Sequence, residues 1–375
     1  MTRKPPILFL FILLCHCSGL EPREIRVVHL HGSAYNRGFL HGRLLKNEIH
    51  VILDQFHAHV KQLYQFPVDS IRSDYLDRVH YQDAIQKLNP SLLDEVRGIA
   101  DGAEIDFDHI FLLQISEEFL DYLDETRPKR CTSIGVSGDD KTPSIVAQNM
   151  DAPYFLHGFP TLLHIKYGSL DLESFVLTSP GLIALNGLNN KGIGVTANGL
   201  PGFSHDLTGL PVAFIIRTVL EKTSYKEAVS FLKSVNHAKT QNYLLGGPDE
   251  TVSLECNGRE VYPFRSKENP RITYHTNHYL AHPHILKEIY CSRLETMKEA
   301  LEKYRYQIGF EEIRSILRST KWNAGRPISH PFCYASTIMV LGSNPVLFMA
   351  PGQPDKYEYE QFDFKKDSLY GGGSG

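Results

Sequence analysis

The sequence changes character at Cys131. Before it, residues 20–130 carry helical periodicity after a short apolar run at 25–30. One predicted helical face is formed by Ile49, Ile52, Phe56, Val60 and Leu63. After it, short apolar runs are separated by turn residues, a pattern that predicts strands, and helices return at 211–222, 224–235, 285–303 and 310–318. Strands in runs with helices between them predict two sheets covered by helical layers.

The two ends of the chain read as segments outside this fold. A basic start, Arg3 and Lys4, precedes a run of eight apolar residues at 7–14, which is too short to span a bilayer as a helix. We therefore expect residues 1–19 to be an export leader, leaving the protein either secreted or lipid-anchored through Cys17, its one route to a membrane. The glycine-rich residues 371–375 are typical of a flexible tail.

Composition excludes several classes of partner. A net charge of −4 gives no reason to expect nucleic acid as a partner. The mature chain would keep four cysteines without a CxxC pair, which argues against a disulfide scaffold and a zinc ribbon. Two close histidine pairs, at 29 and 31 and at 282 and 284, have no third ligand at a recognisable spacing, so neither a metal nor another cofactor is expected.

Cys131 is the strongest candidate for chemistry. It follows Arg127-Pro128-Lys129-Arg130, a basic, proline-bearing segment of the kind where chains are cut, and it opens a predicted strand. Cutting the Arg130–Cys131 bond would leave an α-amino group beside the thiol. That amine has an ordinary pKa near 8 and could accept the thiol proton, so one residue would supply both nucleophile and base. The cut would divide a helical prosegment, 20–130, from a second chain, 131–370.

Three further polar side chains could assist Cys131. Asp151 ends the strand predicted to return beside Cys131, where its carboxylate could hold the new amine. Asn198 and Asn277 stand at strand ends, and side-chain amides there can stabilise the oxyanion formed when an amide is attacked. Each of these residues, taken alone, is more typical of a turn. A Cys–His pair that uses His275 or His278 as the base stays open as the competing mechanism.

Together these residues resemble one family, the acyl-CoA:6-aminopenicillanic-acid acyltransferases, which are cysteine N-terminal-nucleophile hydrolases (the peptidase C45-like group). The match begins with Cys131-Thr132-Ser133-Ile134 and Gln148-Asn149-Met150-Asp151. Similar segments occur elsewhere in the chain, at 32–38, 41–42, 95–102, 187–193, 209–211, 276–278 and 292–293. The resemblance spans about residues 28 to 362 and rests on the order and spacing of these segments.

The resemblance implies an α+β fold, a four-layer αββα sandwich, cut before Cys131 into two chains that stay together. It implies Cys131 as nucleophile, Asn277 as oxyanion donor, Asp151 as partner of the Cys131 amine, and Asn198 lining the site. Substrate-binding or structural roles are implied for three more residues, Gln148, Asn149 and Arg293. Two positions depart from the pattern: Arg130 replaces the usual glycine, and Gln148 replaces the arginine of related bile-salt and N-acylethanolamine hydrolases.

The expected activity is amide-bond hydrolysis or acyl transfer through a Cys131 thioester, on a small N-acyl amine or acyl donor. The cut before Cys131 would come from the chain itself or from a protease that recognises the basic segment. Two alternatives stay open. One is a lipid-amide hydrolase similar to acid ceramidase or N-acylethanolamine amidase, and the other is a secreted binding protein that is never processed and has no catalytic activity.

Overall fold

The computed structural model describes residues 24–367 except 125–129, 169–170, 202–205, 283–289 and 324. The predicted leader, the glycine-rich tail and most of the basic segment before Cys131 lie outside the described residues. Within the described part, no helix combines the length and the apolar character needed to cross a bilayer.

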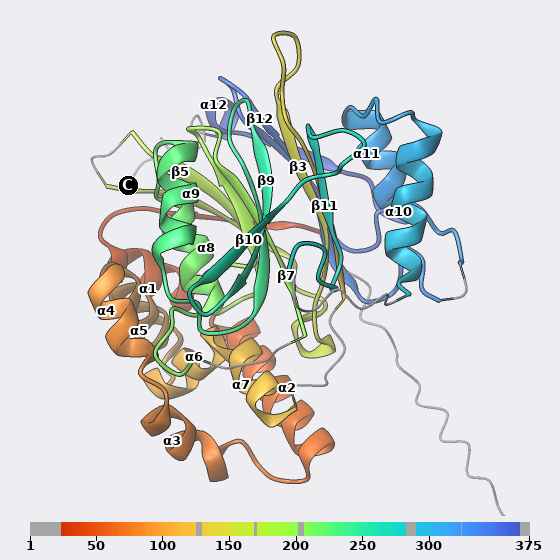
Figure 1. Cartoon of the computed structure of the whole chain (residues 1–375). Helices are drawn as coiled ribbons and strands as arrows, with labels where there is room; N and C mark the ends of the chain where they lie inside the picture. Colours follow the sequence, from red (N-terminus) through yellow and green to blue (C-terminus); the bar gives the residue numbers. More distant parts are fainter. Residues whose placement is uncertain are drawn as a thin grey trace, which may run out of the picture.

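Two sheets form the centre of the molecule (Figure 1). The eight-stranded sheet has the order β1 (Arg26–Leu30), β4 (Thr161–Lys166), β5 (Glu173–Thr178), β6 (Asn186–Asn189), β7 (Gly194–Gly199), β8 (Gln241–Gly246), β9 (Thr251–Asn257) and β10 (Glu260–Phe264). The six-stranded sheet has the order β11 (Ile272–His275), β2 (Cys131–Val136), β3 (Ser144–Asp151), β12 (Cys333–Leu341), β13 (Val346–Ala350) and β14 (Glu360–Asp363).

The sheets pack face to face, because β2 and β3 of the smaller sheet contact β7, β8 and β9 of the larger one. Helices α8 (Val212–Leu220) and α9 (Tyr225–Ser234) cover the larger sheet, where α8 contacts β6 and β7. Helices α10 (Ser292–Lys303) and α11 (Phe310–Leu317) lie over the smaller sheet, where Ile134 and Ile338 share a core with Leu294 and Leu317 (Figure 1). The predicted four-layer αββα sandwich is confirmed.

The N-terminal segment, residues 24–124, is mostly helical as predicted and packs beside one end of the sandwich (Figure 1). Its helices are α1 (Ala34–Leu44), α2 (Lys46–Tyr64), α3 (Asp69–Arg78), α4 (Tyr81–Leu88), α5 (Ser91–Ala103), α6 (Phe107–Gln114) and α7 (Ser116–Leu123). Its strand β1 joins the larger sheet parallel to β4. This segment would form the first of two chains after a cut at Cys131, and it would then supply an edge strand to the second chain.

Several element boundaries differ from the sequence prediction. Strand β6 starts at Asn186 instead of 183, and α10 starts at Ser292 instead of 285. Strands β10 and β14, together with the short η1 (Tyr154–Leu156) and α12 (Phe364–Asp367), were not predicted. Both missed strands are at sheet edges, and most of their residues are exposed or half-buried, so neither shows the polar–apolar alternation of a strand with one buried face.

Four glycines let α1 and α5 cross with their backbones in contact. Gly38 and Gly42 face Gly98 and Gly102, and a Cβ on any of them would collide with backbone atoms of the opposite helix. These glycines belong to the two segments 32–42 and 95–102 that carry part of the family resemblance. Close helix crossing therefore explains why glycine recurs there at a spacing of four residues.

Gly98→Ala is expected to lower the free energy of unfolding by about 1–3 kcal/mol, because the new methyl group meets the Tyr35 carbonyl oxygen. Helix propensity alone predicts the opposite sign, a gain of about 1 kcal/mol for alanine. Urea unfolding would decide between the two effects. Asp94→Ala, at an exposed position of the same helix, is the control and should stay within about 0.5 kcal/mol of the parent protein. A more stable Gly98→Ala protein would contradict the close crossing.

A buried ionic group joins the N-terminal segment to the sandwich. Glu95 of α5 accepts from Arg217 of α8 through both carboxylate oxygens, at 2.6 and 3.0 Å, and from Arg37 at 3.1 Å. The Glu95 and Arg217 side chains are fully buried. The two guanidinium groups hold the pKa of Glu95 below its usual range although burial opposes this. Removing one member would leave an unpaired buried charge, so this group is a strong link between the two parts.

Candidate active site

Cys131 lies at the start of β2, between β11 and β3 of the smaller sheet. The β2–β3 hairpin pairs Cys131 with Met150, so Asp151 follows directly beside it, as the sequence predicted. The Cys131 Sγ lies 3.7 Å from the backbone oxygen of Asp151 and 3.9 Å from the Met150 Sδ. A short antiparallel return was sufficient to bring the candidate nucleophile and the candidate carboxylate together.

Asn277 and Arg293 meet at Cys131 from distant parts of the chain. The Cys131 N–H donates to Asn277 Oδ1 at 2.7 Å, and Arg293 Nη2 donates to the same oxygen at 2.9 Å. Arg293 Nη1 also donates to the Cys131 carbonyl oxygen and, at 3.0 Å, to Thr132 Oγ1. Asn277 Nδ2 donates to the Gly199 carbonyl at 2.8 Å, so in the uncleaved chain this amide group is already in use. Its role toward an oxyanion stays a prediction.

Asp151 has a neighbour that the sequence did not reveal. His330 Nε2 lies 2.9 Å from Asp151 Oδ2, and both side chains are buried. The backbone N–H of Phe332 donates to His330 Nδ1 at 3.2 Å. His330 is one of 18 histidines in the chain and belongs to no recognisable motif, so no local signal could have singled it out.

The remaining predicted residues lie close to Cys131 but face other ways. Asn198 Oδ1 accepts from Ser133 Oγ at 2.8 Å between the sheets, and its neighbours Ala197 and Gly199, rather than Asn198, line the cavity described below. Gln148 and Asn149 alternate across β3. Gln148 donates to the Ala197 carbonyl of the opposing sheet at 2.7 Å, whereas Asn149 donates to the Leu317 carbonyl of α11 at 2.9 Å. Both contacts hold neighbouring layers together.

A cavity of about 250 Å³ opens beside Cys131. Its wall is mainly apolar, with contributions from the N-terminal segment, the loop after β3, β7 and α8; representative residues are Leu63, Leu120, Phe155, Ile216 and Phe332. Its polar residues include Asp151, Glu117 and Glu118. Burial raises the pKa of Glu118 to about 7, against the attraction of Lys239. Such a cavity fits an apolar group attached to the atom that Cys131 attacks.

The surroundings of Cys131 favour the protonated form of its thiol. Burial, and then the negative charge of Asp151, raise the pKa of this thiol well above its usual range. A base is therefore needed before Cys131 can act as a nucleophile. Arg130, on the other side of the bond, stacks 4.0 Å over the Phe332 ring, and Arg326 stacks 4.6 Å over the same ring.

The histidines of the competing mechanism have other partners. His275 is buried, with Nε2 2.9 Å from Glu255 Oε1 and Nδ1 2.9 Å from the Thr276 carbonyl. His278 Nδ1 lies 3.4 Å from Thr276 Oγ1, which also accepts from the Cys291 thiol at 3.6 Å. Despite burial, the neighbouring His278 and the charge of Arg293 lower the pKa of Cys291 to about 6. The one Cys–His pair formed by these two histidines in the described part of the chain is thus Cys291–His278, which makes Cys291 a useful control for Cys131.

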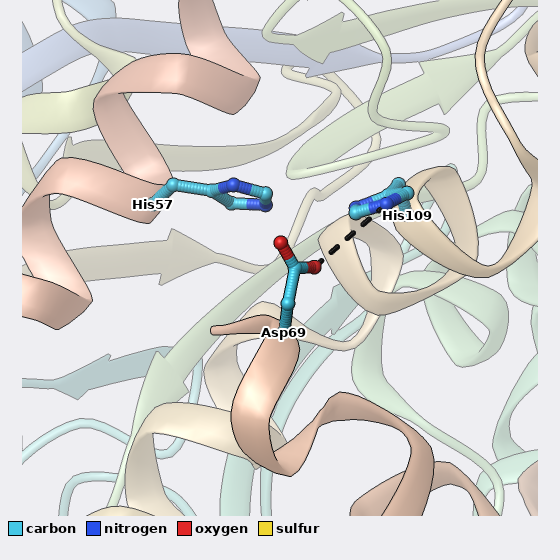
Figure 2. A group of neighbouring side chains, drawn as sticks. All are labelled: His57, Asp69 and His109. Carbon is cyan, nitrogen blue, oxygen red and sulfur yellow. Dashed lines mark ion pairs between the residues drawn. The ribbon is translucent and has the colours of Figure 1, made fainter. Parts of the chain in front are cut away.

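One group in the described part of the chain brings metal-ligating side chains together: His57 of α2, Asp69 of α3 and His109 of α6 (Figure 2). Figure 2 shows both imidazole rings turned toward the Asp69 carboxylate. Arg72 Nη1 donates to Asp69 Oδ1 at 2.7 Å and lies 2.8 Å from His109 Nδ1. The Arg72 guanidinium thus supplies the positive charge between the Asp69 carboxylate and the His109 imidazole. We therefore assign no metal to this group. It does not contribute to the cavity wall described above.

Comparisons with known proteins place this chain in a family. The family described as acyl-coenzyme A:6-aminopenicillanic acid acyl-transferase matches residues 137–324, half of the 375-residue chain. The match includes Asp151, Asn277 and Arg293 and begins shortly after Cys131. The 40 kDa form of acyl-coenzyme A:6-aminopenicillanic-acid acyltransferase from Emericella nidulans is 27% identical over 255 residues, covering 66% of this chain and 68% of the relative.

More distant likenesses extend to other organisms. Protein dcd1A of Dictyostelium discoideum is 30% identical over 118 residues, which cover 27% of this chain and 26% of that protein. A mutant conjugated bile acid hydrolase from Clostridium perfringens is 12% identical with a TM-score of 0.41, covering 62% of this chain and 93% of its own. Penicillin V acylase from Agrobacterium tumefaciens is 14% identical with a TM-score of 0.39, covering 63% and 87%. Both TM-scores are below 0.5, so the fold assignment rests on strand order and layer contacts. The family match and the site geometry lead to one conclusion: the chain belongs to the acyl-coenzyme A:6-aminopenicillanic acid acyltransferase family.

Proposed function

We propose that the chain is cut between Arg130 and Cys131, and that the freed Cys131 is the nucleophile of an amide-bond hydrolase or acyltransferase. One observation carries the proposal. The Cys131 thiol lies in the wall of a mainly apolar cavity, next to a buried carboxylate, Asp151, whose Oδ1 has no hydrogen-bond partner in the uncleaved chain. A cut at this bond creates an amine on Cys131, whose Sγ lies 3.7 Å from the Asp151 backbone oxygen, and an amine is the donor that a buried carboxylate oxygen needs.

The cut can proceed by an N-to-S acyl shift. The Cys131 sulfur attacks the Arg130 carbonyl carbon, the C–N bond breaks, and the nitrogen takes up the proton released from the thiol. The Arg130 acyl group is then held as a thioester on Cys131. Water hydrolyses this thioester, leaving an Arg130 carboxylate and a Cys131 that carries both a free thiol and a free amine. A protease acting on the basic segment would give the same two ends.

Turnover repeats this chemistry on a substrate. The Cys131 amine accepts the thiol proton, and the thiolate attacks the acyl carbon of the substrate amide. Asn277 and a backbone N–H stabilise the oxyanion, and the leaving amine takes the proton as the C–N bond breaks. Water then releases the carboxylic acid, or a second amine takes the acyl group and forms a new amide. The proposal includes both outcomes.

The mainly apolar wall favours an apolar acyl group on a small N-acyl amine or acyl donor. The relative from Emericella nidulans is named for transfer from an acyl-coenzyme A to 6-aminopenicillanic acid, and this likeness supports acyl chemistry here. An apolar cavity is equally compatible with a lipid amide, which keeps that alternative within the proposal. Export from the cell stays a prediction, since it depends on residues 1–19.

Intact mass and N-terminal sequencing of the purified protein test the proposal. We expect two fragments that purify together, with the second beginning Cys-Thr-Ser-Ile, because the β1–β4 pairing and the Glu95–Arg217 ion pair join the two parts. The cut protein should hydrolyse members of a panel of acyl amides, with products identified by mass. A single uncut chain without turnover would favour the secreted binding protein, and a second fragment starting elsewhere would exclude the mechanism.

A further inference from the structure

We propose that His330 is a positioning residue, which holds the Asp151 carboxylate in the orientation that receives the Cys131 amine after the cut. The inference rests on the proposed N-terminal-cysteine mechanism and adds to it a residue that touches neither substrate nor thiol. It assigns a role to a histidine from the loop between α11 and β12, a part of the chain far in sequence from both Cys131 and Asp151.

Contacts of the His330 ring determine which nitrogen carries the proton. Nδ1 accepts from the backbone N–H of Phe332 at 3.2 Å, so Nδ1 is the bare nitrogen of a neutral ring. The proton is then on Nε2, the atom that lies 2.9 Å from Asp151 Oδ2. The side chains of His330 and Asp151 are 2% and 3% exposed, so water cannot replace either partner freely. The protonated nitrogen is thus the one that lies close to the Asp151 carboxylate, although no hydrogen bond is formed between them in this structure.

The same assignment argues against His330 as a base. A base needs a free acceptor nitrogen, and the acceptor nitrogen of this ring is already used by Phe332. Protonating Nδ1 would break that backbone contact inside a buried site. The geometry therefore favours orientation of Asp151 over proton transfer from the thiol.

The contact is incomplete in the uncleaved chain. Although His330 Nε2 lies 2.9 Å from Asp151 Oδ2, neither Nε2 nor Asp151 Oδ1 forms a hydrogen bond. Leaving a buried donor or acceptor unsatisfied costs about 1–3 kcal/mol. The new Cys131 amine can donate to one carboxylate oxygen while His330 donates to the other. Both unsatisfied atoms would then be paired, so the cut completes the site.

Other charged or titratable groups near Asp151 have different roles. The negative charge of Asp151 acts to raise the pKa of four of these groups: Arg130, Cys131, His157 and Cys333. Arg326 acts on Arg130 and stacks on Phe332, so it adds positive charge on the Arg130 side of the site. His157 Nε2 lies 3.1 Å from the Ala152 carbonyl, and burial lowers the pKa of His157. His157 is thus a buried histidine near Asp151 that is held by the backbone, and it serves as the control.

The experiment compares His330→Leu, His330→Gln, Asp151→Asn and the double variant His330→Leu/Asp151→Asn, each recovered in the cut form. Activity of the parent should fall on an acidic limb, between about pH 5 and 8, as the Cys131 amine becomes protonated. Asp151 raises the pKa of that amine, so Asp151→Asn should move the limb to lower pH. His330→Leu should move the acidic limb in the same direction by a smaller amount. It should also lower kcat about 10- to 100-fold, with KM little changed, because the carboxylate is misplaced.

Three comparisons make the result specific. His330→Gln keeps a donor at similar reach and should restore much of kcat and of the limb, whereas His330→Asn, whose amide is too short, should not. His157→Gln should leave the limb unchanged. In the double variant, loss of His330 should add nothing to the limb shift of Asp151→Asn, because the histidine acts through that carboxylate. If His330→Leu does not fold, the comparison of His330→Gln with His330→Asn tests the inference instead.

Two outcomes would overturn the inference. One is a His330→Leu or His330→Asn protein whose kcat and acidic limb equal those of the parent. The other is a double variant in which the limb shifts of the two single variants add fully. Failure of the proposed function looks different, since the parent protein would then lack a fragment beginning at Cys131. If the parent protein is cut and active and the His330 variants behave like it, only the role assigned to this histidine is excluded.

Discussion

The Cys131→Ala protein is expected to purify as one uncut chain and to show no turnover of any amide that the parent protein hydrolyses. Without the sulfur, neither the acyl shift that breaks the Arg130–Cys131 bond nor the attack on substrate can occur. Although the site is buried, alanine is close in size to cysteine, so the fold should be preserved. Intact mass measures the cut, and product detection measures turnover.

Cys291→Ala is the matched control for this experiment. Cys291 is also buried, and its pKa of about 6 makes it more readily ionised than Cys131, whose pKa is raised. If ionisation in the uncleaved chain selected the nucleophile, Cys291 would be that residue. We expect Cys291→Ala to be cut and active. An active Cys131→Ala protein, or an inactive Cys291→Ala protein that is folded and cut, would contradict the assignment. A Cys131→Ala chain that is still cut but inactive would identify an external protease as the agent.

Asn277→Ala is expected to fold but to lose on the order of 100-fold or more in kcat, the scale for removal of one oxyanion donor. The uncleaved chain uses both ends of this amide. Oδ1 accepts from the Cys131 N–H and from Arg293, and Nδ2 donates to the Gly199 carbonyl. For Asn277 to serve the oxyanion, Nδ2 must turn to the substrate oxygen, a change that the release of Cys131 N from its peptide bond permits.

Asn277→Asp separates the two ends of the side chain. Aspartate keeps an acceptor for Arg293 and for Cys131 N but has no Nδ2 donor. If donation to the oxyanion is the role of Asn277, the aspartate variant should be as slow as the alanine variant. Activity close to that of the parent in Asn277→Asp would show instead that the residue acts by holding Arg293 and the Cys131 backbone. Steady-state kcat on the best amide of the panel is the measurement.

Local sequence was enough to predict many of the elements and one contact of the site. The first hairpin is encoded by two adjacent strand runs and the turn between them, so its register places Asp151 beside Cys131 without help from the rest of the chain. The larger features of the sandwich also follow from local patterns, since most of the buried strands carry an apolar run. Edge strands such as β10 escaped prediction because they bury little.

The segments that hold the glycines of α1 and α5 were recognised in the sequence as part of a family pattern, but the spacing of the glycines and its cause were not. Only the packing of α1 against α5 explains why Gly38 and Gly98 cannot carry a side chain. The split roles of Gln148 and Asn149 have a similar origin. Adjacent residues on a strand face opposite ways, and only the assembled layers decide that one meets β7 and the other meets α11.

The family resemblance named Asn277 and Arg293, whereas only the tertiary structure supplied their contacts with Cys131. These residues stand 146 and 162 positions after Cys131, and they meet it because β11 pairs with β2 and α10 covers the same sheet. No sequence pattern pointed to His330, because a histidine that positions a carboxylate can lie at any distance from it along the chain. Periodicity and turns depend on neighbours along the chain and can be read from the sequence, whereas these contacts depend on how distant layers pack, so the folded structure alone determines them.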